Sequence, residues 1–397
     1  MRILSSLPVV VVSRKGEERV RNGHPWIYKS DVVSSAAGPG DLVRVLNERK
    51  RTLGVALWSS RSLISLRFLG FDNDVADERT FFAARLESAI VYRSSIAATA
   101  GASNVFRLVS GEGDRLPGLV VDSYDGHLVV QTLSEGMDRR LAMLVELLVA
   151  RLKPRGVLAR NDPRVRALEG LEEKIEVLHG EIPDELDVIE NELKFRIDLK
   201  HGQKTGMFLD QRENHFWVAL HGHGKALDAF TYNGGFAMNM ARMGATSVLA
   251  IDSSASAVAT TRGNAELNGL ENIEVREANV FDELRELEIA GERFDTIVLD
   301  PPAFAKNKAS IPKAAAGYKE INLRAIKLLN PDGTLITCSC SYNVSEELFL
   351  EIVEQAAADA RATVAVIEKR QQARDHPVLL NVPETHYLKC LVLRRLP

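Results

Sequence analysis

The sequence has few cysteines and no long hydrophobic run, and both shortages exclude classes of protein. Three cysteines in 397 residues are too few for a disulfide framework. They also lack metal-ligand spacing with any nearby histidine, so we expect no metal site. The apolar run near the N-terminus is short and charged residues follow it at once, which argues against a signal peptide or a membrane span. We therefore expect a cytoplasmic protein.

A strong net charge is also absent, because the formal value is −4 at pH 7. The charge is unevenly distributed, however: residues 14–67 contain eleven Lys and Arg against five Asp and Glu. This basic part favours a module that faces nucleic acid, with a solvated charged surface as the alternative. Hydrophobic residues make up 45% of the chain, and this content together with the length predicts two or three globular domains.

Two domains are expected in the first half of the chain. Short β-like runs separated by turn clusters predict a small β-rich domain over residues 1–75. Residues 76–198 combine helical patterns at 81–98 and 137–152 with strand candidates, including a hairpin at 106–123, and predict an α+β domain. This middle domain shows no catalytic constellation, so we expect it to position the substrate.

Strands and helices alternate through residues 199–397, which predicts a doubly wound α/β domain. A strand, a glycine turn and a helix over residues 226–243 place a ligand at the carboxyl end of the strand. The next strand ends in Asp252, roughly twenty residues past the glycines, where a carboxylate can bind a ribose. The full G-x-G-x-x-G pattern is missing, so a nucleoside without a pyrophosphate fits better than a dinucleotide.

The N-terminal stretch RVRNGHPWIYKSDV, residues 19–32, resembles the opening of the PUA RNA-binding domain. The alternative is that Pro25 and Trp26 are only a turn and a core aromatic. The resemblance implies RNA contact by a set of basic side chains suited to phosphates rather than to base edges: Arg14, Lys15, Arg19, Arg21 and Lys29.

Six motifs together resemble the S-adenosylmethionine-dependent ribosomal RNA large-subunit cytosine-C5 methyltransferases with an N-terminal PUA domain. They are Q-K-T-G-M-F-L-D-Q-R (203–212), D-A-F-T-Y-N-G-G-F (228–236), I-D (251–252), L-D-P-P-A-F (299–304), G-Y-K-E-I-N (317–322) and C-S-C-S (338–341). The resemblance spans nearly the whole chain and implies a Rossmann-like class I methyltransferase domain that uses S-adenosyl-L-methionine. It also implies large-subunit (23S) ribosomal RNA as the partner, without metal or membrane, and leaves a homodimer open.

The same resemblance implies a set of cofactor-binding residues. It assigns Phe230, Asn233 and Gly234 to the methionine part of the cofactor, Asp252 with Ser253 to the ribose, and Asn279 with Val280 to the adenine; Phe208, Asp210, Gln211 and Asp300 flank the site. Relatives often carry Asp at the position of Asn279, but the Asn carbonyl oxygen can still accept from an exocyclic amine.

The chemistry implied for cytosine C5 needs a nucleophile, because C5 takes a methyl group only after C6 is attacked and N3 is protonated. The resemblance places the thiolate at Cys340 and gives Asp300 the task of holding or protonating N3. The rigid Pro301-Pro302 turn would present carbonyls to a base splayed out of the RNA, and Phe304 would stack on it.

Several alternatives stay open at the level of sequence. Cys338 lies two residues before Cys340, so strand periodicity alone does not exclude it as the nucleophile. Ala303 stands where many RNA cytosine-C5 enzymes carry another cysteine, so the group that assists release of the covalent intermediate is undetermined. The D-P-P-x-F motif also suits an amino- or guanine-directed RNA methyltransferase, in which Cys340 is inert. A non-catalytic RNA-binding protein that retains the cofactor fold is the third hypothesis.

Overall fold

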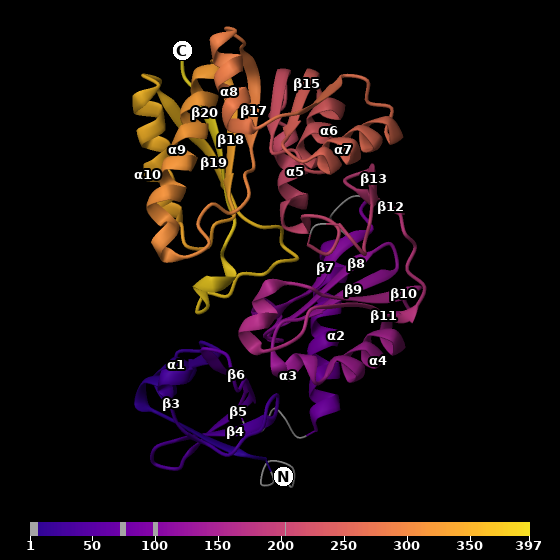
Figure 1. Ribbon diagram of the computed structural model, residues 1–397, viewed down its shortest axis with the longest axis vertical. Helices are drawn as coiled ribbons and strands as arrows, with labels where there is room; N and C mark the ends of the chain where they lie inside the picture. The colour runs from indigo at the N-terminus through magenta and orange to yellow at the C-terminus, as the bar shows by residue number, and fades with distance from the viewer. Residues whose placement is uncertain (1–6, 72–76, 98–101, 203) are drawn as a thin grey trace. The chain divides into compact units, whose positions relative to one another are not determined.

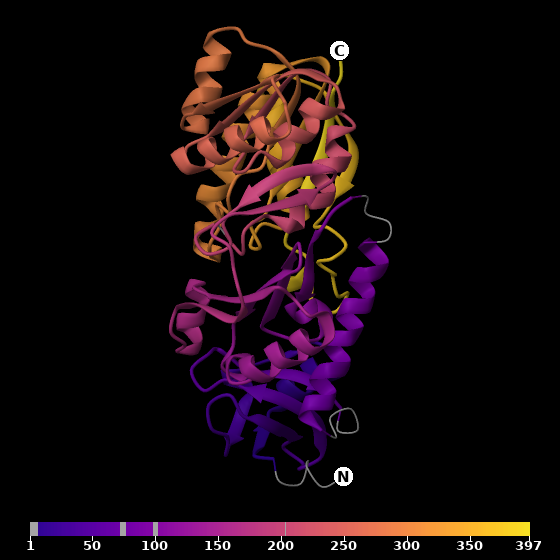
Figure 2. The same cartoon turned by 90° about the vertical axis from the view of Figure 1, so that its right-hand side faces the viewer.

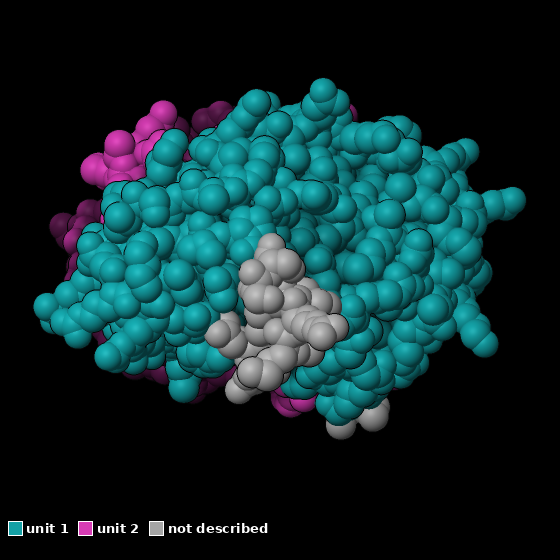
Figure 3. Space-filling model, turned by 90° about the horizontal axis from the view of Figure 1, so that it is seen from below, with its two compact units in different colours: residues 1–188, 197–207, 375–385 teal, residues 189–196, 208–374, 386–397 magenta. Residues whose placement is uncertain are grey.

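The computed structural model describes residues 7–71, 77–97, 102–202 and 204–397 (Figure 1). These residues divide into two compact units, coloured separately in Figure 3. Unit 1 comprises residues 1–188, 197–207 and 375–385, and unit 2 comprises residues 189–196, 208–374 and 386–397. The predicted boundaries near residues 75 and 198 stay predictions. The first of them, like Gln203 of the Q-K-T-G motif, lies outside the described residues.

The first part of unit 1 is a six-stranded sheet in the order β2-β6-β5-β4-β1-β3. The β1–β4 pair is parallel and the other neighbours are antiparallel. Its elements are β1 (Val9–Val12), α1 (Arg14–Arg21), β2 (Trp26–Tyr28), β3 (Val32–Ser35), β4 (Leu42–Asn47), β5 (Thr52–Trp58) and β6 (Ile64–Gly70). Inward-facing apolar residues such as Val10, Val45 and Leu66 form its core. The predicted β-rich domain is therefore confirmed.

The second part of unit 1 is a five-stranded sheet in the order β11-β10-β9-β8-β7 with helices packed on it. Its elements are α2 (Glu78–Ala97), β7 (Val105–Ser110), β8 (Leu119–Tyr124), β9 (His127–Thr132), α3 (Glu135–Asp138), α4 (Leu141–Leu152), β10 (Gly156–Asn161) and β11 (Lys174–Gly180). The helix predicted over residues 137–152 is in fact two helices. The chain breaks between them because the buried Arg140 guanidinium donates to the carbonyls of Gly136 and Gly40. The hairpin β12 (Leu186–Glu190) and β13 (Leu193–Ile197) follows.

Unit 2 is built on a seven-stranded sheet in the order β16-β15-β14-β17-β18-β20-β19. Only β20 runs antiparallel to its neighbours. The strands are β14 (Gly224–Ala229), β15 (Ala245–Asp252), β16 (Ile273–Glu277), β17 (Phe294–Leu299), β18 (Leu329–Ser339), β19 (Val364–Arg370) and β20 (Lys389–Arg395). The helices are α5 (Arg212–Ala219), α6 (Gly235–Met243), α7 (Ala255–Leu267), α8 (Val280–Ile289), α9 (Ile311–Leu328) and α10 (Glu346–Asp359).

Helices cover both faces of this sheet, as Figures 1 and 2 show. Alternate residues of each strand face opposite sides: Ile297 and Leu299 join the core under α8, α9 and α10, whereas Val298 packs with α6 and α7. The predicted doubly wound α/β domain is confirmed. Within the described ranges, no helix combines the length and the apolarity needed to cross a membrane.

Some element boundaries differ from the prediction. The sequence predicts a helix over residues 318–329, but helix α9 begins at Ile311. Pro312 fits a first helical turn, and Asn307 and Ser310 form a capping box just upstream. Helix α8 directly follows Asn279, which caps it. Strand β19, which begins with the apolar residues Val364–Ile367, was not predicted.

Candidate functional site

The turn between β14 and α6 is held by a buried carboxylate. Asp228 accepts hydrogen bonds from the Thr231 hydroxyl at 2.6 Å and from the Ala237 amide at 3.0 Å. Burial raises the pKa of Asp228 to about 6. The turn is strained, because Phe230 and Tyr232 have φ of +68° and +52° in addition to Gly234 at +88°. Such strain persists because the surrounding contacts fix the turn, as is common where a ligand binds.

Asp252 lies at the carboxyl end of β15, beside this turn. Its carboxylate accepts from the amide of Tyr232 at 3.0 Å and from the amide of Ser254 at 2.9 Å, and it remains partly exposed. Ser253 is exposed next to it. The structure thus brings the predicted ribose carboxylate to the predicted methionine loop.

Asn279 is exposed and caps helix α8. Its side-chain oxygen accepts from the amides of Phe281 and Asp282 at 3.0 and 3.4 Å. The oxygen expected to meet adenine is therefore the one that caps the helix, and an Asp at this position can do the same. Val280 follows as a buried core residue. Their contact with adenine stays a prediction.

The L-D-Q segment, Leu209–Gln211, forms a short 3-10 helix whose polar side chains are buried. The Phe208 ring packs edge-on against Tyr232 of the cofactor turn, with ring centres 4.9 Å apart. Asp210 accepts from the Tyr387 hydroxyl at 2.8 Å, and Gln211 accepts from the Asn214 amide at 2.7 Å. Phe208 thus lies beside the turn, and the contact of this segment with the cofactor stays a prediction.

His215 and Glu190 form a buried pair that the sequence analysis did not identify. Their Nδ1 and Oε1 atoms are 2.6 Å apart, and both side chains are nearly inaccessible. Burial lowers the pKa of His215, but the carboxylates of Glu190, Asp300 and Asp228 together more than offset this and the net shift is upward. The ring lies against the cofactor turn, because a Cβ added at Gly235 would be 2.6 Å from its Nε2. In the sequence, the feature that could have indicated a role for His215 was its position just after the L-D-Q-R motif.

Asp300 lies at the end of β17, adjacent in the sheet to β14. Burial raises its pKa to about 7; the carboxylates of Asp210 and Asp228 add to this shift and His215 opposes it. A carboxyl with such a pKa is partly protonated at neutral pH, so it can donate as well as accept a proton. Pro301 is buried after it, while Pro302 and Ala303 are exposed.

Phe304 belongs to an aromatic cluster. Its ring centre lies 4.7 Å from that of Tyr318 and 6.0 Å from that of Phe281. The ring is half-buried, so part of it is accessible. Stacking of Phe304 on a base stays a prediction.

The two cysteines of the C-S-C-S motif differ in environment. Cys338 is inaccessible within β18, directly opposite Cys390, and its hydrogen bond with Cys390 and its burial raise its pKa well above the usual range. Cys340 follows the strand end and is partly exposed. Its thiol donates to the Pro301 carbonyl, with sulfur and oxygen 3.7 Å apart. The geometry therefore favours Cys340 over Cys338 as the accessible nucleophile.

The predicted RNA-binding cations belong to unit 1, and three of the five are in ion pairs within the same domain. Arg14 pairs with Glu18 at 3.0 Å and Arg21 with Glu17 at 2.7 Å, both one helical turn apart on α1. Arg19 lies 3.5 Å from Asp31. Lys15 and Lys29 are exposed.

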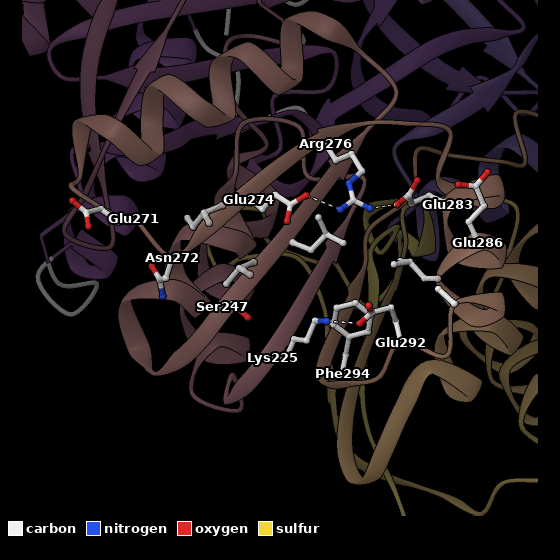
Figure 4. Close-up of a pocket in the computed structure, with 15 residues that line it drawn as sticks. Lys225, Ser247, Glu271, Asn272, Glu274, Arg276, Glu283, Glu286, Glu292 and Phe294 are labelled. Atoms are coloured by element: carbon white, nitrogen blue, oxygen red, sulfur yellow. Dashed lines mark hydrogen bonds and ion pairs between the residues drawn. The ribbon is translucent and has the colours of Figure 1, made fainter.

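A groove of about 600 Å³ in unit 2 lies away from these motifs (Figure 4). It is lined by residues near the amino ends of β15, β16 and β17, such as Ser247, Ile273 and Phe294, whereas the motifs lie at the carboxyl ends. Its glutamates partly pair with Arg276 and Lys225, as the dashed lines in Figure 4 mark. No group of three or more acidic, His or Cys side chains suited to a metal ion occurs in the described parts of the chain.

Comparison with known proteins decides the family. Residues 107–394 match the family model described as S-adenosylmethionine-dependent methyltransferase, and residues 10–71 match that of a PUA-like domain. The chain belongs to the S-adenosylmethionine-dependent methyltransferase family. The predicted fold class, family and cofactor are thus confirmed for this methyltransferase.

Relatives of the methyltransferase match along almost their whole length. The proteins named ribosomal RNA large subunit methyltransferase I of Tolumonas auensis and Vibrio cholerae are 39% and 38% identical to it, over 97% of this chain and 98% and 100% of theirs. Among solved structures, SMU.776, described as a methyltransferase complexed with SAH, has a TM-score of 0.85 at 20% identity, covering 97% of this chain and 99% of that one. At that identity the likeness shows the fold alone.

Proposed function

We propose that this methyltransferase transfers a methyl group from S-adenosylmethionine to C5 of a cytidine in large-subunit ribosomal RNA. The names of its relatives support the RNA substrate. The assignment to C5 rests on the contact between Cys340 and Pro301. Cys340 is partly exposed, whereas the other cysteines of the described residues are buried, and the contact brings it to the motif that contains Asp300. Cytoplasmic location and a homodimer stay predictions.

The residues around the cofactor turn fit S-adenosylmethionine, which supplies an electrophilic methyl group when bound. The side-chain amide nitrogen of Asn233 is buried without a hydrogen-bond partner among the described residues, and so is one carboxylate oxygen of Asp228. Buried polar atoms of this kind are costly unless a ligand or water satisfies them. Asn233 and the backbone of Gly234 would hold the methionine part, and Asp252 the ribose.

Cys340 and Asp300 would act on the base. The thiol of Cys340 loses its proton, and the thiolate adds to C6 of the cytosine while protonated Asp300 donates to N3. C5 then carries the electron density needed to take the methyl group. Water takes the proton from C5 and the thiolate is expelled from C6, which restores the C5–C6 double bond, and N3 returns its proton to Asp300.

Of the five predicted cations, Lys15 and Lys29 are exposed and are not among the three in the ion pairs described above. We expect these two lysines to contact RNA phosphates. The paired arginines must exchange a carboxylate for a phosphate to do so.

The deciding experiment measures methyl transfer from labelled S-adenosylmethionine to deproteinised large-subunit ribosomal RNA, followed by nucleoside analysis. We expect 5-methylcytidine from the wild type and from Cys338→Ala, but none from Cys340→Ala. Full activity of Cys340→Ala, or a methylated purine as the product, would contradict the proposal and favour the amino- or guanine-directed reaction.

A further inference from the structure

Lys389 is a buried cation next to the C-S-C-S motif. It is the first residue of β20, pairs with Ser339 of β18 in the sheet, and is only 3% exposed. Its ammonium donates to the carbonyl of Ser341 at 2.8 Å and to that of Tyr387 at 2.9 Å. Ser341 directly follows Cys340, so Lys389 holds the main chain at the nucleophile.

This ammonium has no ion-pair partner in the part of the chain that the structure describes. Burial lowers the pKa of Lys389 to about 8, whereas the negative charges of Cys340 and Glu346 favour its protonated form. Glu346 is already engaged with Lys369 at 2.7 Å. Folding stability does not explain a buried Lys without a carboxylate partner, because an uncharged side chain at this position would avoid the cost of desolvation.

The hydroxyl groups around the motif are neutral, and its carboxyl groups, Glu346 and Asp300, carry no positive charge. The hydroxyl of Tyr318, on α9, is hydrogen-bonded with Ser341 at 2.9 Å and Ser339 at 3.1 Å. Burial raises the pKa of Tyr318, and the negative charge of Cys340 adds to that shift, so the phenol stays protonated. The charge of Cys340 interacts with Tyr318 on α9 and with Lys389 on β20, and of these two groups only Lys389 can carry a positive charge.

We propose that Lys389 is a positioning residue whose positive charge favours the thiolate of Cys340 and whose hydrogen bond to Ser341 fixes that thiolate beside Pro301. The proposal rests on the role of Cys340 proposed above. The thiol proton leaves to solvent and Lys389 keeps its own three protons. Two of these bond the carbonyls of Ser341 and Tyr387, and the positive charge that remains interacts with the negative charge of Cys340.

The test is the pH dependence of Cys340 alkylation by iodoacetamide in the full-length protein, quantified on the Cys340 peptide by mass spectrometry. Lys389→Met should raise the pH at the midpoint of alkylation by about one unit. At a pH below the midpoint, this shift corresponds to a thiolate fraction about tenfold smaller than in the wild type. Lys389→Arg, which keeps the charge, should stay close to the wild type. Lys369→Met is the matched control: it removes an exposed lysine of β19 that contacts the same Glu346, and should leave the midpoint unchanged.

An unchanged midpoint in folded Lys389→Met would overturn the proposal and leave Lys389 a purely structural residue. If Lys389→Met does not fold, the wild type decides, because a midpoint at or above about 8.5, the value of an ordinary cysteine, contradicts the proposal. Methyl transfer is not the readout. Activity that survives in Cys340→Ala would overturn the proposed function, whereas the alkylation midpoint separately reports whether Lys389 acts on the thiol.

Discussion

The ring of His215 occupies the space in which a side chain at Gly235 would lie, with its Nε2 only 2.6 Å from the position of that Cβ. Glycine is required here for close approach rather than for its backbone angle, since Gly235 is already the first residue of helix α6. The buried pair of His215 and Glu190 and the cofactor turn therefore depend on each other's position.

Gly235→Ala should displace either the turn or the His215 ring. We expect a loss of roughly 1–3 kcal/mol in the free energy of unfolding, as for other overpacked sites, and at least tenfold weaker binding of S-adenosylmethionine. Denaturant unfolding and calorimetric titration measure the two effects. Gly263→Ala in helix α7 is the control, because a Cβ there meets nothing within 4 Å, and it should stabilise the protein by roughly 0.5–1 kcal/mol.

Glu190→Gln should lower stability in a pH-dependent way. Because Glu190 raises the pKa of His215 in the folded state, its contribution is fully present below about pH 6.5 and is lost as the pH rises through the folded-state pKa. The difference in unfolding free energy between wild type and variant should therefore shrink as the pH increases. Glu192→Gln, which alters an exposed carboxylate in the same hairpin, should show no such trend. A difference that grows with pH would contradict this assignment.

Asp300→Asn should also gain stability relative to the wild type as the pH rises, but over a lower pH range. The folded-state pKa of about 7 exceeds the unfolded value of about 3.9, so ionisation of Asp300 increasingly disfavours the folded state between these two values. The variant should gain stability relative to the wild type as the pH rises from about 4 to about 7, and the gain should level off above that. Thermal unfolding across this range tests the prediction, with Asp332→Asn as an exposed control.

Asn233→Ala should separate ligand binding from folding. The buried amide nitrogen lacks a hydrogen-bond partner among the described residues, so its removal should leave the unfolding free energy of the ligand-free protein within about 1 kcal/mol of the wild type. Affinity for S-adenosylmethionine should fall about tenfold or more, the value of one lost hydrogen bond to a charged group. Calorimetric titration measures the affinity, and equal loss of stability and affinity would argue for a structural role.

The parts of the site that are local in sequence could be predicted from it. The turn around Gly234, the carboxylate at Asp252 and the motif at Asp300 each follow a short apolar strand, and in a parallel sheet the ends of such strands share one edge. The nucleophile could be narrowed to two cysteines. The resemblance placed the nucleophile at Cys340, and burial and register favour the same residue, because Cys338 is enclosed against Cys390.

The groups that act through long-range contacts could not be predicted. Glu190 meets His215 across 25 positions, and Lys389 reaches Ser341 across 48. Neither Glu190 nor Lys389 stands in a motif, and a lone Glu or Lys at a strand end is usually a solvated residue. The N-terminal arginines are a different case. Their positive charge is evident in the sequence, but their ion pairs with Glu17, Glu18 and Asp31 were seen only in the structure.

The division of the chain has a consequence for how this protein could have been assembled. Each unit is made of three separate segments, and residues 375–385 belong to unit 1 although the chain before and after them belongs to unit 2. Along the chain, strand β20, which carries Lys389, therefore comes after a segment that belongs to unit 1. A gene fusion of two complete, consecutive domains does not produce such an order. No single cut in the chain therefore separates the two units.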